Sequence, residues 1–354
     1  EFRRVLFRSA GNETLSSEIL GQIIERSQGV PFFAEELAKS ILESHSPAAE
    51  GRSRGRDPNM LLSVPSTLQD SLMGRLDRLG PNKEVAQLCA VLGREFSFSL
   101  LAAVSHLEPS QLAQALERLV DSDLLSQRSR PPQATYVFRH ALLQDAAYNS
   151  LLKATRIDLH SRVAVYLAAE AEHAPELIAH HCSRGGLTEE AVDWWRQAAE
   201  RAVARSAYAE AIRNYENAVS EIDGVVVQRG GQVSGATLRQ AIDLRLALRS
   251  AIVAGGKFEQ ALDCLNEAQA LAKSLDDTDR MGRIAVFLAV QFYGVGQYAQ
   301  AIAHAERALA LAARQKKVDL EAEANTYLGF AHYLQGDFKG GDRKSTRLNS
   351  SHLV

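Results

Sequence analysis

Residues 256–261 read Gly-Lys-Phe-Glu-Gln-Ala, and this pattern recurs at a fixed interval. Residues 296–301 (Gly-Gln-Tyr-Ala-Gln-Ala) repeat it 40 positions later, and residues 336–338 (Gly-Asp-Phe) begin a further copy after another 40. A looser copy, Ser-Ala-Tyr-Ala-Glu-Ala at 206–211, lies 50 positions before the first. The extra length matches a Gly- and Val-rich insert at 224–236. A fixed period of this size is typical of stacked helix pairs.

Each part of the repeated pattern has an expected structural role. Glycine suits a tight turn between two helices, because it adopts backbone angles that other residues avoid. We expect the aromatic residue to plug the space between the helices and the alanines to let the second helix lie close to the first. A small residue recurs seven positions after the first alanine, in the pairs Ala211/Ala218, Ala261/Ala268 and Ala301/Ala308. Residues 154–341 are therefore predicted to form helical hairpins that stack into a superhelix with a concave face. The pattern resembles tetratricopeptide repeats.

The preceding residues, 60–153, have a different organisation. Apolar residues at helical spacing predict several helices, including a short one over 96–104 and a longer one over 109–120. Apolar runs at 124–125 and 136–138 then flank a polar tip. Helices followed by a two-stranded ribbon predict a winged-helix domain. The predicted fold class is thus mainly α: a helical segment and a winged helix, followed by a tetratricopeptide-like α-solenoid.

A winged helix suggests DNA binding, but the helix that would enter the groove of DNA argues against it. Residues 109–123 carry Glu117, Asp121 and Asp123 against a single Arg118. A reading helix needs cations for phosphates and polar side chains for base edges. The net charge of the whole chain is −3, so we expect no nucleic-acid partner.

A predicted strand-to-helix junction lies at Arg139 and His140. The run 135–138 is β-branched or aromatic, and an apolar stripe at helical spacing follows over 142–152. A helix N-terminus offers free N–H groups and a partial positive charge, so these two side chains could meet a phosphate there. The alternative is that His140 only caps the helix.

The cysteines, the histidines and the apolar runs bear on the cellular compartment, on metal binding and on membrane insertion. Cys89, Cys182 and Cys264 lie far apart, which fits a reducing cytosol and indicates neither a disulfide framework nor a metal site. His180 and His181 are adjacent and would point to different faces of a helix, so they do not predict a two-histidine metal site. Apolar runs are too short and too often interrupted by charge to span a bilayer. We expect a cytoplasmic chain without a membrane segment.

The two ends have an unusual relationship. Residues 1–9 and 342–350 can be encoded by one DNA element read in opposite orientations, and this element resembles a sequencing-library adaptor. We therefore expect residues 1–9 and 342–354 to be cloning or assembly scars and the remainder to be an internal fragment of a longer protein. Within residues 10–59, Gly29-Val30-Pro31 separates two predicted helices, because Pro31 cannot lie in a helix interior.

Five segments between residues 18 and 222 together carry a resemblance to a known class of proteins. They are residues 27–37, 75–79 (Arg-Leu-Asp-Arg-Leu), 90–96, 138–142 (Phe-Arg-His-Ala-Leu) and 175–181. As a set they resemble the C-terminal part of signal-transduction NTPases of the STAND class. The nearest resemblance is to bacterial multidomain adenylate/guanylate cyclases that carry an AAA-like ATPase and tetratricopeptide repeats. Residues 10–59 would then be a helical segment at the end of the ATPase module.

The resemblance implies roles for three residues. In this class a Gly-x-Pro motif packs against the adenine ring, and a histidine of the winged-helix domain contacts the β-phosphate of bound ADP. These roles fall on Gly29, Pro31 and His140, although Arg139 and Ala141 depart from the Met-His-Asp motif of plant resistance proteins. The resemblance also implies ATP or ADP, with Mg, in the intact parent, and no cofactor tightly bound to the fragment itself.

Three hypotheses about function remain open. In the first, the chain is a regulatory fragment of a nucleotide-switched signal-transduction protein, whose parent is an adenylate/guanylate cyclase and whose repeats bind a protein or peptide on their concave face. In the second, the parent is a LuxR-type ATP-dependent transcriptional regulator. In the third, the chain is a purely structural repeat scaffold. The sequence has neither a Gly-x-x-x-x-Gly-Lys-Ser/Thr loop nor a cyclase domain, so we do not expect the fragment itself to be an enzyme.

Overall fold

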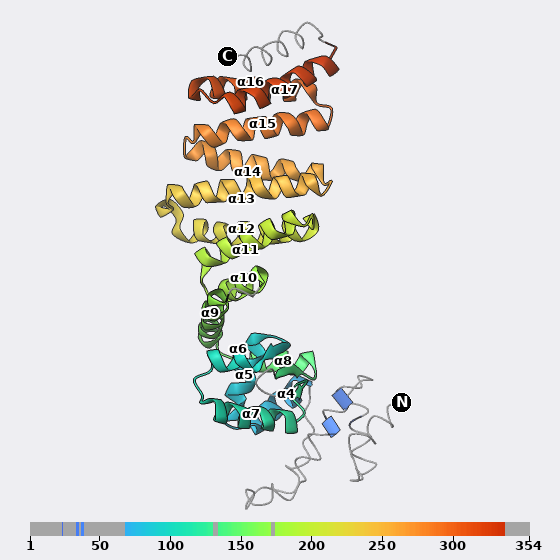
Figure 1. Cartoon of the computed structure of the whole chain (residues 1–354), viewed down its shortest axis with the longest axis vertical. Helices are drawn as coiled ribbons and strands as arrows, with labels where there is room; N and C mark the ends of the chain where they lie inside the picture. Colours follow the sequence, from blue (N-terminus) through green and yellow to red (C-terminus); the bar gives the residue numbers. More distant parts are fainter. Residues whose placement is uncertain are drawn as a thin grey trace, which may run out of the picture. The chain divides into compact units, whose positions relative to one another are not determined.

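The computed structural model describes residues 23, 33, 34, 37, 38, 68–129, 134–170 and 174–336 (Figure 1). Gly29 and Pro31 lie outside the described residues. The chain divides into two compact units, Glu1–Tyr166 and Leu167–Val354. Helices dominate the described part of each unit, so the prediction of a mainly α fold is confirmed.

The described part of the first unit combines short helices with a small sheet. Its helices are α4 (Leu68–Arg78), α5 (Asn82–Leu92), α6 (Phe98–Val104), α7 (Pro109–Asp121), α8 (Ala141–Asn149) and the start of α9 (Lys153–Ala169). Strands β1 (Glu95–Ser97), β2 (Leu125–Gln127) and β3 (Thr135–Phe138) form a sheet in the order β1-β3-β2, in which β3 is antiparallel to both neighbours. The winged-helix interpretation of residues 60–153 stays a prediction.

The prediction of one helix over 96–104 is wrong at its start, because the first strand lies there. Phe96 pairs with Tyr136 of β3, and their rings stack with centroids 6.0 Å apart. The Ser97 hydroxyl then accepts a hydrogen bond from the N–H of Leu100 (3.2 Å) and caps α6, which therefore begins at Phe98. The predicted two-stranded ribbon is consequently a three-stranded sheet.

The second unit is a stack of helices in which each packs against the next along the chain (Figure 1). The helices are α10 (Pro175–Arg184), α11 (Thr188–Ala204), α12 (Tyr208–Arg229), α13 (Gly235–Ala254), α14 (Ala261–Ser274), α15 (Thr278–Gly294), α16 (Tyr298–Gln315) and α17 (Val318–Leu334). Two short 3₁₀ turns, η3 (Gly230–Gln232) and η4 (Phe258–Gln260), lie between them. The prediction of a tetratricopeptide-like α-solenoid is confirmed.

The turns between helices have the backbone that the repeated glycine predicts. Gly256, Gly296 and Gly336 have φ values of 79°, 78° and 85°, in the region that favours glycine. The looser copy has Ser206 at this position, and its φ is also positive, at 60°. The backbone at this position therefore has a positive φ in all four copies, and only the residue differs.

The alanines behave as predicted, whereas one aromatic residue does not. The six paired alanines are completely buried where the helices meet: Ala211, Ala218, Ala261, Ala268, Ala301 and Ala308. Phe258, which was predicted to plug the space between helices, is instead 42% exposed and lies in η4. The insert expected at 224–236 begins as a helix, because α12 continues through its first residues and ends at Arg229.

Within residues 68–129, 134–170 and 174–336, no helix is both long enough and apolar enough to cross a bilayer.

Candidate functional site

His140 occupies the N-cap position of α8. Its backbone is extended (φ −131°, ψ 135°), and its carbonyl oxygen accepts hydrogen bonds from the N–H groups of Leu143 (3.1 Å) and Gln144 (3.4 Å). The imidazole is half-buried and makes no capping hydrogen bond to the helix. The backbone of His140 therefore starts the helix, and a role for its ring in contacting phosphate stays a prediction.

The neighbouring Arg139 has a partner that the sequence did not indicate. Its Nη2 lies 3.2 Å from Oδ1 of Asp123, and its backbone N–H donates to the carbonyl of Leu124 (3.1 Å). Both charged side chains are exposed, and such pairs contribute at most about 1 kcal/mol to stability. The pairing joins the start of α8 to the turn before β2.

In the second unit, a groove crosses three helices, α11, α13 and α15. Each of them is the first helix of its pair. One hollow of about 500 Å³ is lined by residues that include Arg196, Glu200, Arg239, Gln240, Asp243 and Arg280. An adjoining hollow of about 270 Å³ is lined by residues that include Leu246, Ser250, Asp279, Arg283 and Phe287. Asp243, Ala247 and Arg280 line both hollows, so we call the two together the groove.

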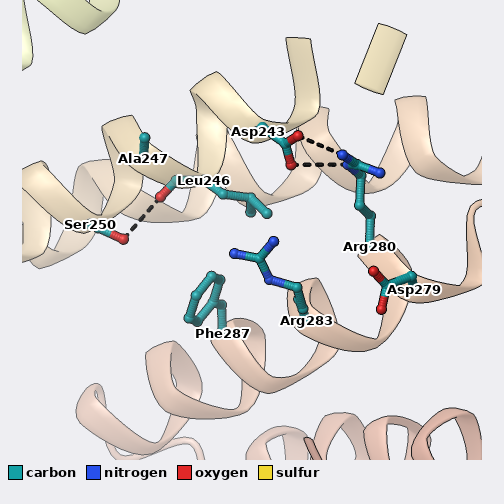
Figure 2. Close-up of a pocket in the computed structure, with 8 residues that line it drawn as sticks. All are labelled: Asp243, Leu246, Ala247, Ser250, Asp279, Arg280, Arg283 and Phe287. Atoms are coloured by element: carbon teal, nitrogen blue, oxygen red, sulfur yellow. Dashed lines mark hydrogen bonds and ion pairs between the residues drawn. The ribbon is translucent and has the colours of Figure 1, made fainter. Parts of the chain in front are cut away.

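Arg280 connects α13 to the start of α15 within the groove (Figure 2). Its Nε and Nη2 donate to Oδ1 and Oδ2 of Asp243 at 2.9 and 2.5 Å, and its Nη1 donates to Oδ2 of Asp277 at 2.9 Å. These hydrogen bonds, of which those to Asp243 matter most, raise the pKa of the guanidinium above its already high ordinary value. A bidentate pair of this kind fixes geometry as well as charge.

Asp277, the other carboxylate that Arg280 contacts, is the N-cap residue of α15. Its Oδ1 accepts a hydrogen bond from the N–H of Arg280 (3.0 Å), and its Oδ2 lies 3.4 Å from Nε of Arg239. Burial alone would raise the pKa of Asp277. The hydrogen bonds from Arg280 and the positive charges of Arg280 and Arg239 outweigh burial and lower the pKa.

One cation of the groove differs from the others. Arg196 pairs with Glu200 (2.8 Å) and Asp193 (3.6 Å). Arg283 is exposed, and within the described part of the chain it has no hydrogen-bond or ion-pair partner. Its guanidinium extends between Leu246 and Phe287 in Figure 2.

The groove therefore offers paired charges, one guanidinium without a partner in the described residues, and an apolar surface. This set of groups suits recognition of a ligand. Elsewhere in the chain, burial raises the pKa of the Cys182 and Cys264 thiols to about 11, which keeps both protonated at neutral pH. Among the described residues there is no cluster of three or more His, Cys, Asp or Glu side chains that could hold a metal ion.

Sequence analysis did not single out the groove residues. A signal was present, because Arg280, Arg283 and Phe287 are spaced i, i+3 and i+7 and so share one face of a helix. Their partner Asp243 lies 37 residues earlier, and no local pattern indicates that pairing.

No protein-family model matches the chain. An uncharacterised protein from Rhizobium meliloti (strain 1021) is 32% identical over 198 residues, which cover 54% of this chain and 19% of that protein. The chain thus spans about a fifth of the length of the curated relative that it matches.

Three solved structures resemble the chain at low TM-scores. The STAND protein with a tetratricopeptide repeat sensor from Pyrococcus horikoshii has a TM-score of 0.38 at 11% identity, covering 100% of this chain and 60% of that one. Aspartyl phosphate phosphatase F from Bacillus subtilis has 0.36 at 9% identity, covering 100% and 91%. BtubC from P. vanneervenii has 0.35 at 17% identity, covering 79% and 90%.

Proposed function

We propose that the groove binds a segment of a partner polypeptide, and that the chain is the partner-sensing arm of a nucleotide-switched signalling protein. The observation that carries the first part is the groove, which crosses α11, α13 and α15 and offers charged and apolar groups along its length. A surface that crosses successive helix pairs suits an elongated ligand. A polypeptide segment supplies charged and apolar side chains at regular spacing, as this lining requires.

A substitution in the middle of the groove tests this part. Ala247 lines both hollows, so Ala247→Trp should obstruct the groove. Peptides are first selected on the wild-type chain from a phage-displayed library of random dodecapeptides, and their affinities are then measured by fluorescence anisotropy. We expect Ala247→Trp to weaken binding by at least about tenfold, a loss of about 1.4 kcal/mol.

The matched control places the same side chain outside the groove. Ala303 is an exposed residue of α16 that lines neither hollow, and Ala303→Trp should bind the selected peptides as the wild type does. Failure to enrich any peptide, or equal binding to both tryptophan variants, would overturn the proposed groove function.

The nucleotide-switched part of the proposal rests on the sequence resemblance. Gly29 and Pro31 would contact the adenine ring, and His140 would contact a phosphate of ADP, while a P-loop domain elsewhere in the parent would hold most of the nucleotide and its Mg. His140 is half-buried at the N-cap of α8, where a helix N-terminus favours negative charge. A bound ADP supplies negative charge there, and His140 would bind it and hold the inactive state.

A partner in the groove would change this switch only if it bound the two states with different affinity. The test is to rejoin the chain to its P-loop core and replace His140 by Ala. We expect weaker ADP binding and raised basal activity. His106→Ala, at an exposed histidine of the same unit, is the control and should change neither. Unchanged ADP affinity and activity in His140→Ala would rule out the sensor role.

The parent that we propose is an adenylate/guanylate cyclase, on the strength of the same motifs. A long read through the source locus would test this directly. A cyclase domain and a P-loop upstream would support it, whereas a P-loop without a cyclase, with a basic helix-turn-helix downstream, would support the LuxR-type regulator instead. A purely structural scaffold predicts that ATP analogues do not crosslink to the intact protein.

A further inference from the structure

At one position of the repeat, a single copy has a large residue where the other copies have a small one. Seven residues before the turn residue, three copies have a small side chain: Ala199 before Ser206, Ala289 before Gly296 and Gly329 before Gly336. The remaining copy has Arg249 before Gly256. Small residues at a helix interface let the backbones approach, so a long charged side chain here needs another explanation.

Arg249 is buried without the partners that a buried charge normally has. Its side chain is 6% exposed, and within the described part of the chain neither Nε nor Nη2 has a hydrogen-bond acceptor. Burial lowers its pKa, against a small opposing effect of Tyr327. Its guanidinium carbon lies 4.5 Å from the centroid of the Phe287 ring. Cation–π stacking offsets only part of the free-energy cost of burying an ion.

This stack lies between α13 and α15, whose backbones make few close approaches. By contrast, α15 and α17 approach closely, and a Cβ on Gly282 of α15 would come within 2.6 Å of Leu320 Cδ2 of α17. The open space beside the stack is the smaller hollow of the groove, where Phe287 is a lining residue.

Arg283 lies at this hollow and is also without a partner in the described residues (Figure 2). The acidic side chains nearby are already engaged: Asp243 by Arg280, and Asp279 by Lys317. Two guanidinium groups therefore leave uncompensated positive charge at one end of the groove. That of Arg283 is exposed, and that of Arg249 is buried behind an aromatic ring. The other charges of the groove are balanced.

We infer that the α13–α15 hollow binds an aspartate or glutamate side chain of the partner polypeptide, with Arg283 as its direct ligand. The inference rests on the proposed function of the groove. Leu246 and Phe287 pack against the methylene stem of the acidic residue, and Arg249 is a positioning residue that holds the Phe287 ring. Folding has already removed water from Arg249. A carboxylate that enters the hollow is therefore attracted by this cation, and binding does not have to desolvate the cation again.

A carboxylate suits this hollow better than a phosphate. A single exposed guanidinium faces the ligand, and the carboxylates of Asp243 and Asp279 line the same hollow. Arg280 and Lys317 already pair with these carboxylates, so one exposed cation is left to balance the ligand, and a group with two negative charges would keep one of them unbalanced beside the carboxylates. A monoanion matches the one exposed cation.

Parallel peptide selections test the inference. Random dodecapeptides on phage are selected on the wild-type chain, on Arg283→Gln, and on Arg314→Gln, which removes an exposed arginine of α16 outside the groove. We expect an acidic residue to be enriched at one position by the wild type and by Arg314→Gln, but not by Arg283→Gln. A synthetic peptide with that acid should bind Arg283→Gln roughly 10- to 100-fold more weakly than the wild type.

Replacing the acid in the peptide by its amide should cause a similar loss in the wild type and little loss in Arg283→Gln. Competition with inorganic phosphate provides a further arm: displacement of the peptide at lower concentration by phosphate than by free glutamate would overturn the assignment of a carboxylate. Selected peptides that bind in the groove without an acidic preference would overturn the inference and leave the proposed function intact. Peptides that bind Ala247→Trp as well as the wild type would overturn the proposed function itself.

Arg249 is tested by two variants. Arg249→Met keeps the volume and removes the charge, and we expect severalfold weaker binding of the acidic peptide with little change for the amide peptide. Arg249→Lys keeps the charge and should retain part of the preference for the acid. Equal loss of both peptides in Arg249→Met, with no recovery in Arg249→Lys, would show that Arg249 is only structural.

Discussion

Arg245 and Arg249 lie one turn apart on α13 and are equally buried, each 6% exposed, but their surroundings are opposite. Arg245 donates to both carboxylate oxygens of Asp223 (2.8 Å each) and to Glu267 (2.8 Å). Arg249 has an aromatic ring beside it and, among the described residues, no carboxylate partner for its Nε and Nη2. The first arginine ties α13 to α12 and α14, and the second stacks on Phe287 of α15.

This contrast predicts opposite effects of one substitution. Arg245→Met should lower the free energy of unfolding by about 1–3 kcal/mol, because it removes charge-assisted hydrogen bonds to two carboxylates. Arg249→Met should leave stability unchanged or raise it, because an uncompensated buried charge is replaced by an apolar side chain of similar volume. Urea denaturation of both variants measures the difference. A larger loss in Arg249→Met than in Arg245→Met would contradict this account.

The buried alanines predict the effect of overpacking. Ala261 and Ala301 are completely buried where paired helices meet, so replacing either by Leu should cost about 1–3 kcal/mol of stability. Ala303→Leu, at an exposed position of α16, is the control and should have little effect. Thermal melting that is the same for all three variants would show that the repeat register is wrong.

The N-cap of α15 predicts a pH dependence. Asn caps a helix about as well as Asp, so Asp277→Asn tests the charge alone. The lowered pKa of Asp277 means that its charge stabilises the fold above the ordinary aspartate pKa of about 3.9, and that this stabilisation is lost as the pH falls through the lower pKa of the folded state. We expect Asp277→Asn to be less stable than the wild type at pH 7 and the difference to shrink below about pH 4. A difference that stays constant across this range would contradict the role of the charge.

The odd turn residue predicts a stabilising change. Ser206 has a φ of 60° where the other copies have glycine. This backbone costs a residue with a side chain about 1–2 kcal/mol, part of which the flexibility of glycine in the unfolded chain offsets. Ser206→Gly should therefore raise stability by about 0.5 kcal/mol, and Gly256→Ala should lower it. Chemical denaturation that gives both changes the same sign would count against this prediction.

The repeats could be predicted from the sequence because their signals are local and recur. Gly256, Gly296 and Gly336 each mark a turn by themselves, and the alanines follow at fixed distances. The strand β1 was missed because it has three residues and is held by pairing with β3, about 40 residues away. Phe258 was misplaced because its spacing indicates a position in the turn but does not decide which neighbours cover it.

The groove was harder to predict for a related reason. Its hydrogen bonds join Asp243 of α13 to Arg280 of α15, and Arg249, which is buried behind Phe287, stands out from the other copies only when they are aligned by their turns. Periodicity reveals what the copies share. It does not indicate the positions where one copy differs from the rest.

Hydrogen–deuterium exchange of the whole chain, with and without a selected peptide, tests the central claim most directly. The account predicts slower exchange in α11, α13 and α15, which line the groove, and unchanged exchange in α12, α14 and α16. Protection confined to α12, α14 and α16, or to the first unit, would contradict the claim that the groove is the binding surface.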